Sequence, residues 1–174
     1  MRLLKIISFV LIVLLLVCCK KKSTKSDDGL PHYWSRYTDC DPAWSPDGNT
    51  IAYIHGGLDD TAGIYLIDID GTNKRLLYKG GTVYSPDFSP DGNWLVFSDY
   101  AQIFKIKLNG DSLTQLTFGG RNFFPDWSPD GEKIAYDVTE PADSFGIYLM
   151  NVDGTSPHLV PGGYCGRYPD FSPD

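Results

Sequence analysis

Trp44-Ser45-Pro46-Asp47-Gly48 decides the fold of this chain, because the chain repeats it. Two further copies are Phe88-Ser89-Pro90-Asp91-Gly92 and Trp127-Ser128-Pro129-Asp130-Gly131, and a fourth begins at Phe171-Ser172-Pro173-Asp174. The repeated serines lie 44, 39 and 44 residues apart. A period near 40 residues with strand-like content is typical of architectures in which each unit buries its faces against its neighbours.

Each Ser-Pro-Asp-Gly segment has the composition of a type I turn. Serine suits the first position, proline fixes φ near −65° at the second, and glycine suits the fourth. A serine that recurs in every unit is better explained by a turn than by a nucleophile, which is needed once. The residues assigned to these structural turns are Ser45, Pro46, Asp47, Gly48, Ser89, Pro90, Asp91, Gly92, Ser128, Pro129, Asp130 and Gly131.

Four short strand-like pieces recur in each unit. The first ends at the aromatic residue before the turn (42–44, 86–88 and 125–127), and the second follows the turn (51–53, 95–97 and 134–136). The third is the clearest strand (64–69, 103–108 and 147–152), with one apolar face throughout. Its period of two residues disfavours a helix.

The fourth piece (75–78, 114–117 and 158–160) follows an Asp-Gly or Asn-Gly dipeptide at 70–71, 109–110 and 153–154. Such dipeptides favour type I′ hairpin turns, in which both central residues have positive φ. The segments 55–63 and 137–146 are longer than their counterpart in the middle unit. Variable recognition is expected on such longer loops of a rigid frame.

Four antiparallel strands per repeated unit predict a β-propeller blade. The combination of Trp-Ser-Pro-Asp-Gly, Ile-Ala-Tyr, Gly-Ile-Tyr-Leu and Asp-Gly resembles the TolB-type, WD-like propeller repeat, and it extends over roughly residues 41–174. The resemblance implies an exported ring of about six or seven blades. It also implies partner-protein binding, as in the periplasmic member of the Tol–Pal system.

The expected fold class is therefore all-β, a partial β-propeller. Its blades are predicted at 41–84, 85–124 and 125–168, and the start of a fourth at 169–174. Because four blades are about the smallest propeller known, the chain is expected to be a truncated ring. The first and third blades should then expose apolar faces, while the missing blades would close the ring. The aromatics Trp44, Phe88, Trp127 and Phe171 are expected to pack between blades.

Residues 1–19 read as an export signal. Arg2 and Lys5 precede an apolar run that is too short for a transmembrane helix. The end of the run, Leu16-Val17-Cys18-Cys19, resembles a bacterial lipobox. Cys19 suits lipid attachment better than Cys18, because the small Cys18 precedes it whereas the bulkier Val17 precedes Cys18. The alternative is an ordinary signal peptide with incidental cysteines.

Residues 20–29 contain no apolar side chain and are predicted to be a flexible tether, followed by a lead-in segment at 30–40. The basic tether either lies on anionic lipid headgroups or is a solvated spacer. Cys40 and Cys165 remain, in a compartment that permits disulfides. They belong to units that would not be adjacent in a large ring, so no bond between them is expected.

The composition also restricts the function. From Asp27 onward the chain carries 9 basic and 22 acidic side chains, a charge of −13 that disfavours nucleic-acid binding. No metal, cofactor or catalytic residue is predicted, because His32, His55 and His158 lack metal-ligand spacing and no nucleophile or nucleotide motif occurs. Asp87, Ser89 and Asp91 match EF-hand positions 1, 3 and 5, but turn chemistry accounts for them and no glutamate stands at position 12.

Together these features predict a non-catalytic, membrane-anchored propeller lipoprotein of the bacterial periplasm or cell exterior, which binds an envelope protein or a cell-wall component. The alternative is a piece of a propeller-containing enzyme, either the cap of a serine peptidase or an oligogalacturonate-lyase-like propeller. A third possibility is a fragment with no activity of its own.

Lipid attachment at Cys19 can be tested in cells. We expect radioactive palmitate to label the mature wild-type protein, and Cys19→Ala to remove both the label and the membrane association. Cys18→Ala should retain the label. A wild-type protein without palmitate, together with normal secretion of the Cys19 variant, would contradict the lipoprotein assignment.

Overall fold

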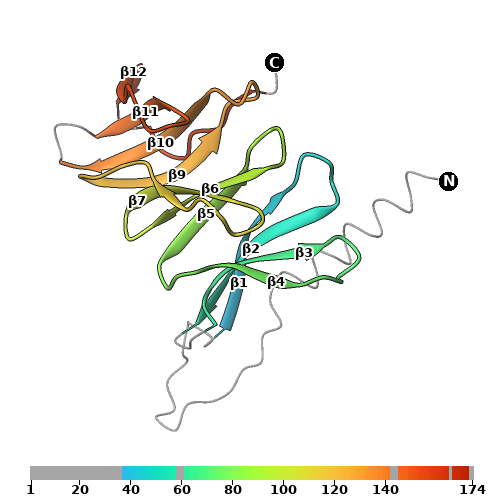
Figure 1. The fold of residues 1–174 in the computed structure, drawn as a ribbon. Coiled ribbons are helices and arrows are strands. Elements are labelled where there is room, and N and C mark those ends of the chain that lie inside the picture. Colours follow the sequence, from blue (N-terminus) through green and yellow to red (C-terminus); the bar gives the residue numbers. More distant parts are fainter. Residues whose placement is uncertain (1–36, 58–60, 142–144, 165, 173–174) are drawn as a thin grey trace, which may run out of the picture.

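The computed structural model describes residues 37–57, 61–141, 145–164 and 166–172 (Figure 1). The predicted signal segment with Cys18 and Cys19, the tether and most of the lead-in lie outside these residues, as does Cys165. The described chain forms three four-stranded antiparallel sheets, which confirms the predicted all-β class and partial propeller. Within it, no helix is long and apolar enough to cross a membrane.

Each sheet contains four strands in chain order. The first holds β1 (Tyr37–Trp44), β2 (Thr50–Gly57), β3 (Gly63–Asp68) and β4 (Arg75–Lys79). The second holds β5 (Val83–Phe88), β6 (Trp94–Asp99), β7 (Gln102–Lys107) and β8 (Thr114–Gln115). The third holds β9 (Arg121–Trp127), β10 (Lys133–Glu140), β11 (Gly146–Asn151) and β12 (His158–Tyr164).

The sheets follow one another in an open arc (Figure 1). The first strands β1, β5 and β9 contact each other in succession, so they form the inner side of the arc. All Ser-Pro-Asp-Gly and Asp/Asn-Gly turns lie at one end of the antiparallel strands, which we call the turn end. The β2–β3, β6–β7 and β10–β11 connections and the links between sheets lie at the opposite end, the loop end.

The inner strands are longer than predicted. β5 begins at Val83 and β9 at Arg121, so residues 83–84 and 121–124, which were assigned to the preceding blades, belong to the second and third sheets. β2 and β10 likewise extend into the predicted loops, to Gly57 and Glu140. The N-terminal parts of the inner strands were missed because a β-bulge interrupts the alternation on which strand prediction depends.

The bulge recurs at the same place in each sheet. Two residues, the second of them proline, oppose a single residue of the neighbouring strand. The residue before the proline has positive φ in all three inner strands: Asp41 (49°), Ser85 (47°) and Phe124 (51°). A proline there also removes a backbone donor, so the inner edge of each sheet is blocked for further strand pairing.

The predicted type I′ hairpins are wrong. Asp70 does not have positive φ, whereas Gly71 (86°) and Asn73 (54°) do. The Gly71 N–H donates to the Asp68 carbonyl at 2.8 Å, and the Asp70 carboxylate accepts the Thr72 N–H at 2.9 Å. That side-chain bond holds Asp70 in a turn with negative φ, so only the glycine takes the left-handed conformation.

Two apolar cores lie between the three sheets. Phe88 is 5% exposed in the first core and Trp127 is 8% exposed in the second, so both pack between blades as predicted. Their counterpart Trp44 is 44% exposed, because no described sheet precedes β1. Each core takes side chains from both of its sheets, and the middle sheet is therefore apolar on both faces.

Truncation of the turn aromatics should reveal this dependence on neighbours. We expect Phe88→Ala and Trp127→Ala each to lower the free energy of unfolding by about 3–5 kcal/mol, because each vacates a buried inter-sheet site. Trp44→Ala should lower it by about 1 kcal/mol or less, because the ring is already half exposed. Urea unfolding of the full chain measures all three, and equal losses would contradict the assignment of the cores.

Candidate functional site

The repeated turn residues hold the frame together at the turn end. In the first turn the Ser45 Oγ donates to the Asp47 carboxylate at 2.6 Å and accepts the Thr50 N–H at 2.9 Å. The Gly48 N–H closes the turn on the Ser45 carbonyl at 2.9 Å. The second and third turns repeat these bonds through Ser89 and Ser128. All three hydroxyls therefore act in the turns rather than as paired nucleophiles.

Two half-buried aspartates bond across the sheets, and the sequence did not single out this role. The Asp87 carboxylate accepts the Trp127 N–H at 2.8 Å, and the Asp126 carboxylate accepts the Phe171 N–H at 2.8 Å. Each aspartate therefore fixes the turn aromatic of the following unit. Ala43 occupies the corresponding place in the first sheet, where Asp41 instead accepts the Ser85 N–H at 3.2 Å.

Burial dominates the electrostatics of these two carboxylates. It raises the pKa of Asp87 to about 6, and the negative charge of Asp126 adds to the effect, while the hydrogen bond from Trp127 opposes it. Burial also raises the pKa of Asp126, helped by the charge of Asp170. The ionised form of Asp87 is therefore destabilised in the folded chain at neutral pH.

The EF-hand-like pattern does not form a cation cage. Asp87 is directed to the next sheet, whereas the Asp91 carboxylate accepts the Ser89 hydroxyl and the Asn93 amide within its own turn. No group of three His, Cys, Asp or Glu side chains suited to a metal occurs among the described residues. His55 contacts Asp39 through Nδ1 at 2.6 Å, and His158 lies exposed on β12.

A groove of about 500 Å³ lies between the second and third sheets at the turn end, beside their shared core. Trp94, Lys105 and Trp127 line it, together with parts of both adjacent turns. The Lys105 ammonium donates to the Val152 carbonyl at 2.7 Å and lies 4.9 Å from the Trp94 ring centroid. Burial lowers the pKa of Lys105. These contacts link the two sheets. The Lys105 ammonium in the groove is therefore already bonded within the protein.

A second surface lies at the loop end and was not predicted. Tyr84 of β5, Phe123 and Phe124 of β9, and Tyr168 form a continuous set of ring contacts, which we call the aromatic stripe. The signal available in the sequence was the pair of aromatics before Pro125, but only the bulge brings them to the inner side of the arc.

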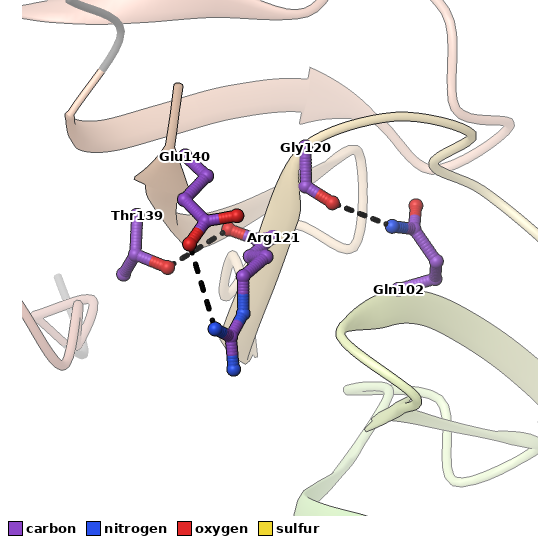
Figure 2. Close-up of polar contacts among 5 residues, drawn as sticks. All are labelled: Gln102, Gly120, Arg121, Thr139 and Glu140. Carbon is purple, nitrogen blue, oxygen red and sulfur yellow. Dashed lines mark hydrogen bonds and ion pairs between the residues drawn. The ribbon is translucent and has the colours of Figure 1, made fainter. Parts of the chain in front are cut away.

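The polar groups beside the stripe are already paired (Figure 2). The Gln102 Nε2 donates to the Gly120 carbonyl at 2.9 Å, which links β7 to the start of β9. Arg121 pairs with Glu140 at 3.5 Å, and the Thr139 hydroxyl donates to the Arg121 carbonyl at 3.4 Å. The polar groups of these residues therefore bond to one another within the protein, beside the stripe.

Neutralising Asp87 should stabilise the chain in a pH-dependent way. Because the folded pKa lies above the ordinary value of 3.8, ionisation makes the wild type lose stability as pH rises from about 4 to about 6. Asp87→Asn keeps an acceptor for the Trp127 N–H without the charge. We expect it to exceed wild type by at most ~3 kcal/mol at pH 7.5 and to match it near pH 4.

Chemical unfolding at the two pH values measures this difference, and Asp47→Asn is the matched control. Hydrogen bonds from Ser45 and Asn49 lower the pKa of exposed Asp47, so its variant should lose rather than gain stability at pH 7.5. An Asp87 variant that is less stable than wild type at pH 7.5 would show that the charged form is favoured in the fold.

The comparisons with known proteins agree with this architecture. The family model described as TolB beta propeller domain matches residues 34–174. An uncharacterised protein of Agrobacterium fabrum, Atu1656, is 41% identical over 70 residues, which are 40% of this chain and 21% of that protein. An uncharacterised peptidase of Bacillus subtilis, YuxL, is 36% identical over 70 residues, 40% of this chain and 11% of the peptidase.

Among solved structures, a TolB candidate from Agrobacterium tumefaciens aligns with a TM-score of 0.58 and 28% identity. The alignment covers 72% of this chain and 49% of that one, so the chain matches about half the length of this solved relative. The matched range includes all three four-stranded sheets and their repeated turns. The chain belongs to the TolB β-propeller family.

Proposed function

We propose that this chain is part of a non-catalytic propeller lipoprotein of the bacterial cell envelope, which binds another protein. The observation that carries the proposal is that the repeated serines and aspartates form structural hydrogen bonds. They close turns and link sheets, so the residues best suited to chemistry build the frame instead. The family relationship supports a propeller used for binding, and the charged, apolar N-terminus of the sequence supports export.

The second candidate is that the chain is the propeller part of a peptidase, because one relative is described as an uncharacterised peptidase. A propeller in such an enzyme covers or orients a separate catalytic domain and does not itself cleave peptides. The match covers 40% of this chain and 11% of that peptidase, so a peptidase function rests on a short shared segment. An oligogalacturonate-lyase-like function would need cationic groups near bound substrate. Lys105 and Arg121 are instead engaged by Val152 and Glu140.

The proposal predicts binding without turnover. The full chain, expressed with its own N-terminus in a bacterial host, should fractionate with membranes and be crosslinked by formaldehyde to a discrete protein. The purified chain should not hydrolyse fluorogenic peptides or depolymerise polygalacturonate above the buffer rate. Turnover by the purified chain that disappears on substitution of one side chain would contradict the proposal. So would membrane-free secretion combined with the absence of a saturable protein adduct.

A further inference from the structure

Exposed aromatic side chains gather at the loop end of the described sheets. Of the large apolar side chains that are exposed in the described residues, five lie at this end: Tyr84, Tyr100, Phe118, Tyr164 and Tyr168. Single exposed apolar residues need no explanation, but a contiguous aromatic surface marks an interaction site. The aromatic stripe joins two of these exposed residues, Tyr84 and Tyr168, through the partly buried rings of Phe123 and Phe124.

Ring contacts connect the stripe across three successive units. Tyr84 of β5 meets Phe123 of β9 edge to face at a centroid distance of 6.4 Å. Phe123 and Phe124 are 6.0 Å apart, and Phe124 lies 4.2 Å from Tyr168. Tyr84 is 46% exposed and Tyr168 is 63% exposed, so the two ends of the stripe are open to solvent.

The repeated bulge places these rings on the inner side of the arc. Phe124 and Tyr168 both precede a proline and both have positive φ, 51° and 56°. Asp41 and Ser85 share this backbone conformation, so it belongs to the repeat and not to the stripe alone. The units thus offer equivalent projecting positions, and aromatic residues occupy them only toward the third sheet and the residues that follow it.

The chemistry of the stripe favours protein side chains over a sugar polymer. Its rings are tilted or perpendicular to one another, with interplanar angles of 78°, 43° and 50°, and so they do not form a flat stacking platform. The neighbouring side-chain amides of Gln102 and Asn122 form hydrogen bonds within the protein. They are therefore not available to bind the hydroxyl groups of a sugar. Tilted aromatic rings beside an arginine resemble the centres of protein interfaces.

The charge of the protein favours a positively charged partner at the stripe. Arg121 is paired with Glu140. Burial raises the pKa of Asp137, and the charge of Arg167 opposes that rise. Burial raises the pKa of Asp87 and of Asp126; the charges of Asp126 and Asp170 add to the effect on Asp87, and the charge of Asp170 adds to that on Asp126. These three carboxylates therefore place acidic groups near one another on the inner side. The body from Asp27 onward also carries a charge of −13, which attracts basic partners at long range.

We propose that the aromatic stripe docks a basic segment of a partner protein, and that apolar side chains of this segment pack against Tyr84, Phe123, Phe124 and Tyr168. This inference rests on the proposed function, since it assigns the surface and the partner chemistry of that binding. The segment does not add a strand to the sheets, because the bulges and prolines block the inner edges of β5 and β9.

The test uses the full chain and a phage-displayed peptide library. Peptides selected on the wild type are synthesised with a fluorophore, and their Kd values are measured by anisotropy. The double variant Tyr84→Ala/Tyr168→Ala removes the exposed ends of the stripe. Leu76→Ala/Leu113→Ala is the matched control, because these leucines are 43% and 48% exposed outside the stripe. Thermal unfolding of both variants verifies their folding.

We expect the selected peptides to be rich in Lys, Arg and apolar residues. The stripe variant should bind them about tenfold or more weakly, and the control should bind them within about twofold of wild type. A photo-crosslinker at position 84 in cells should yield a protease-sensitive adduct, and one at position 113 should not. If the stripe variant itself unfolds, Tyr84→Ser alone, at the open end of the stripe, is measured in the same way.

Other outcomes separate the two proposals. Peptides that bind both variants equally, or selected peptides that are acidic, overturn the stripe as the docking site while protein binding stands. Retention on purified peptidoglycan that is lost in the stripe variant overturns the choice of protein over sugar. The absence of any selected peptide and of any protein adduct at either position overturns the proposed function together with this inference.

Discussion

The burial of each sheet's face against the next sheet is the interaction on which the structure depends. A four-stranded sheet of this size cannot bury its apolar face alone, so its stability comes from its neighbours. The contrast between Trp127, at 8% exposure, and its counterpart Trp44, at 44%, shows that the same side chain position is core or surface according to what lies beside it. The repeat is thus a unit of packing rather than an independent fold.

Polar contacts between successive sheets fix their relative positions. Asp87 and Asp126 each accept the backbone N–H of the next turn aromatic, and Lys105 reaches the end of the third strand of the following sheet. A Cβ built on Gly131 would lie 3.8 Å from Pro90, so consecutive turns also come close enough to touch. These contacts fix the angle between sheets, and burial raises the pKa of the two aspartates that take part.

The two ends of the sheets differ in what they offer to other molecules. At the turn end, short repeated bonds satisfy the serine and aspartate side chains, and the groove beside Trp94 contains an ammonium that is already bonded. At the loop end, connections are less regular, and the exposed rings of Tyr84 and Tyr168 contact partly buried aromatic rings of the third sheet. The binding function that we propose is therefore assigned to the loop end, although the repeated motif is at the turn end.

The sequence by itself determined the repeat, the strand content and the turn positions, because Pro, Gly and alternating apolar residues act locally. It also indicated that aromatics such as Phe88 pack between blades. It could not place the bulges before Pro42, Pro86 and Pro125, because the positive φ of the preceding residue runs against the local preference of an X-Pro pair. Only the packing of sheet on sheet decided which aromatics became core, which became the stripe, and which carboxylates were buried, because these depend on neighbours about 40 residues away in the chain.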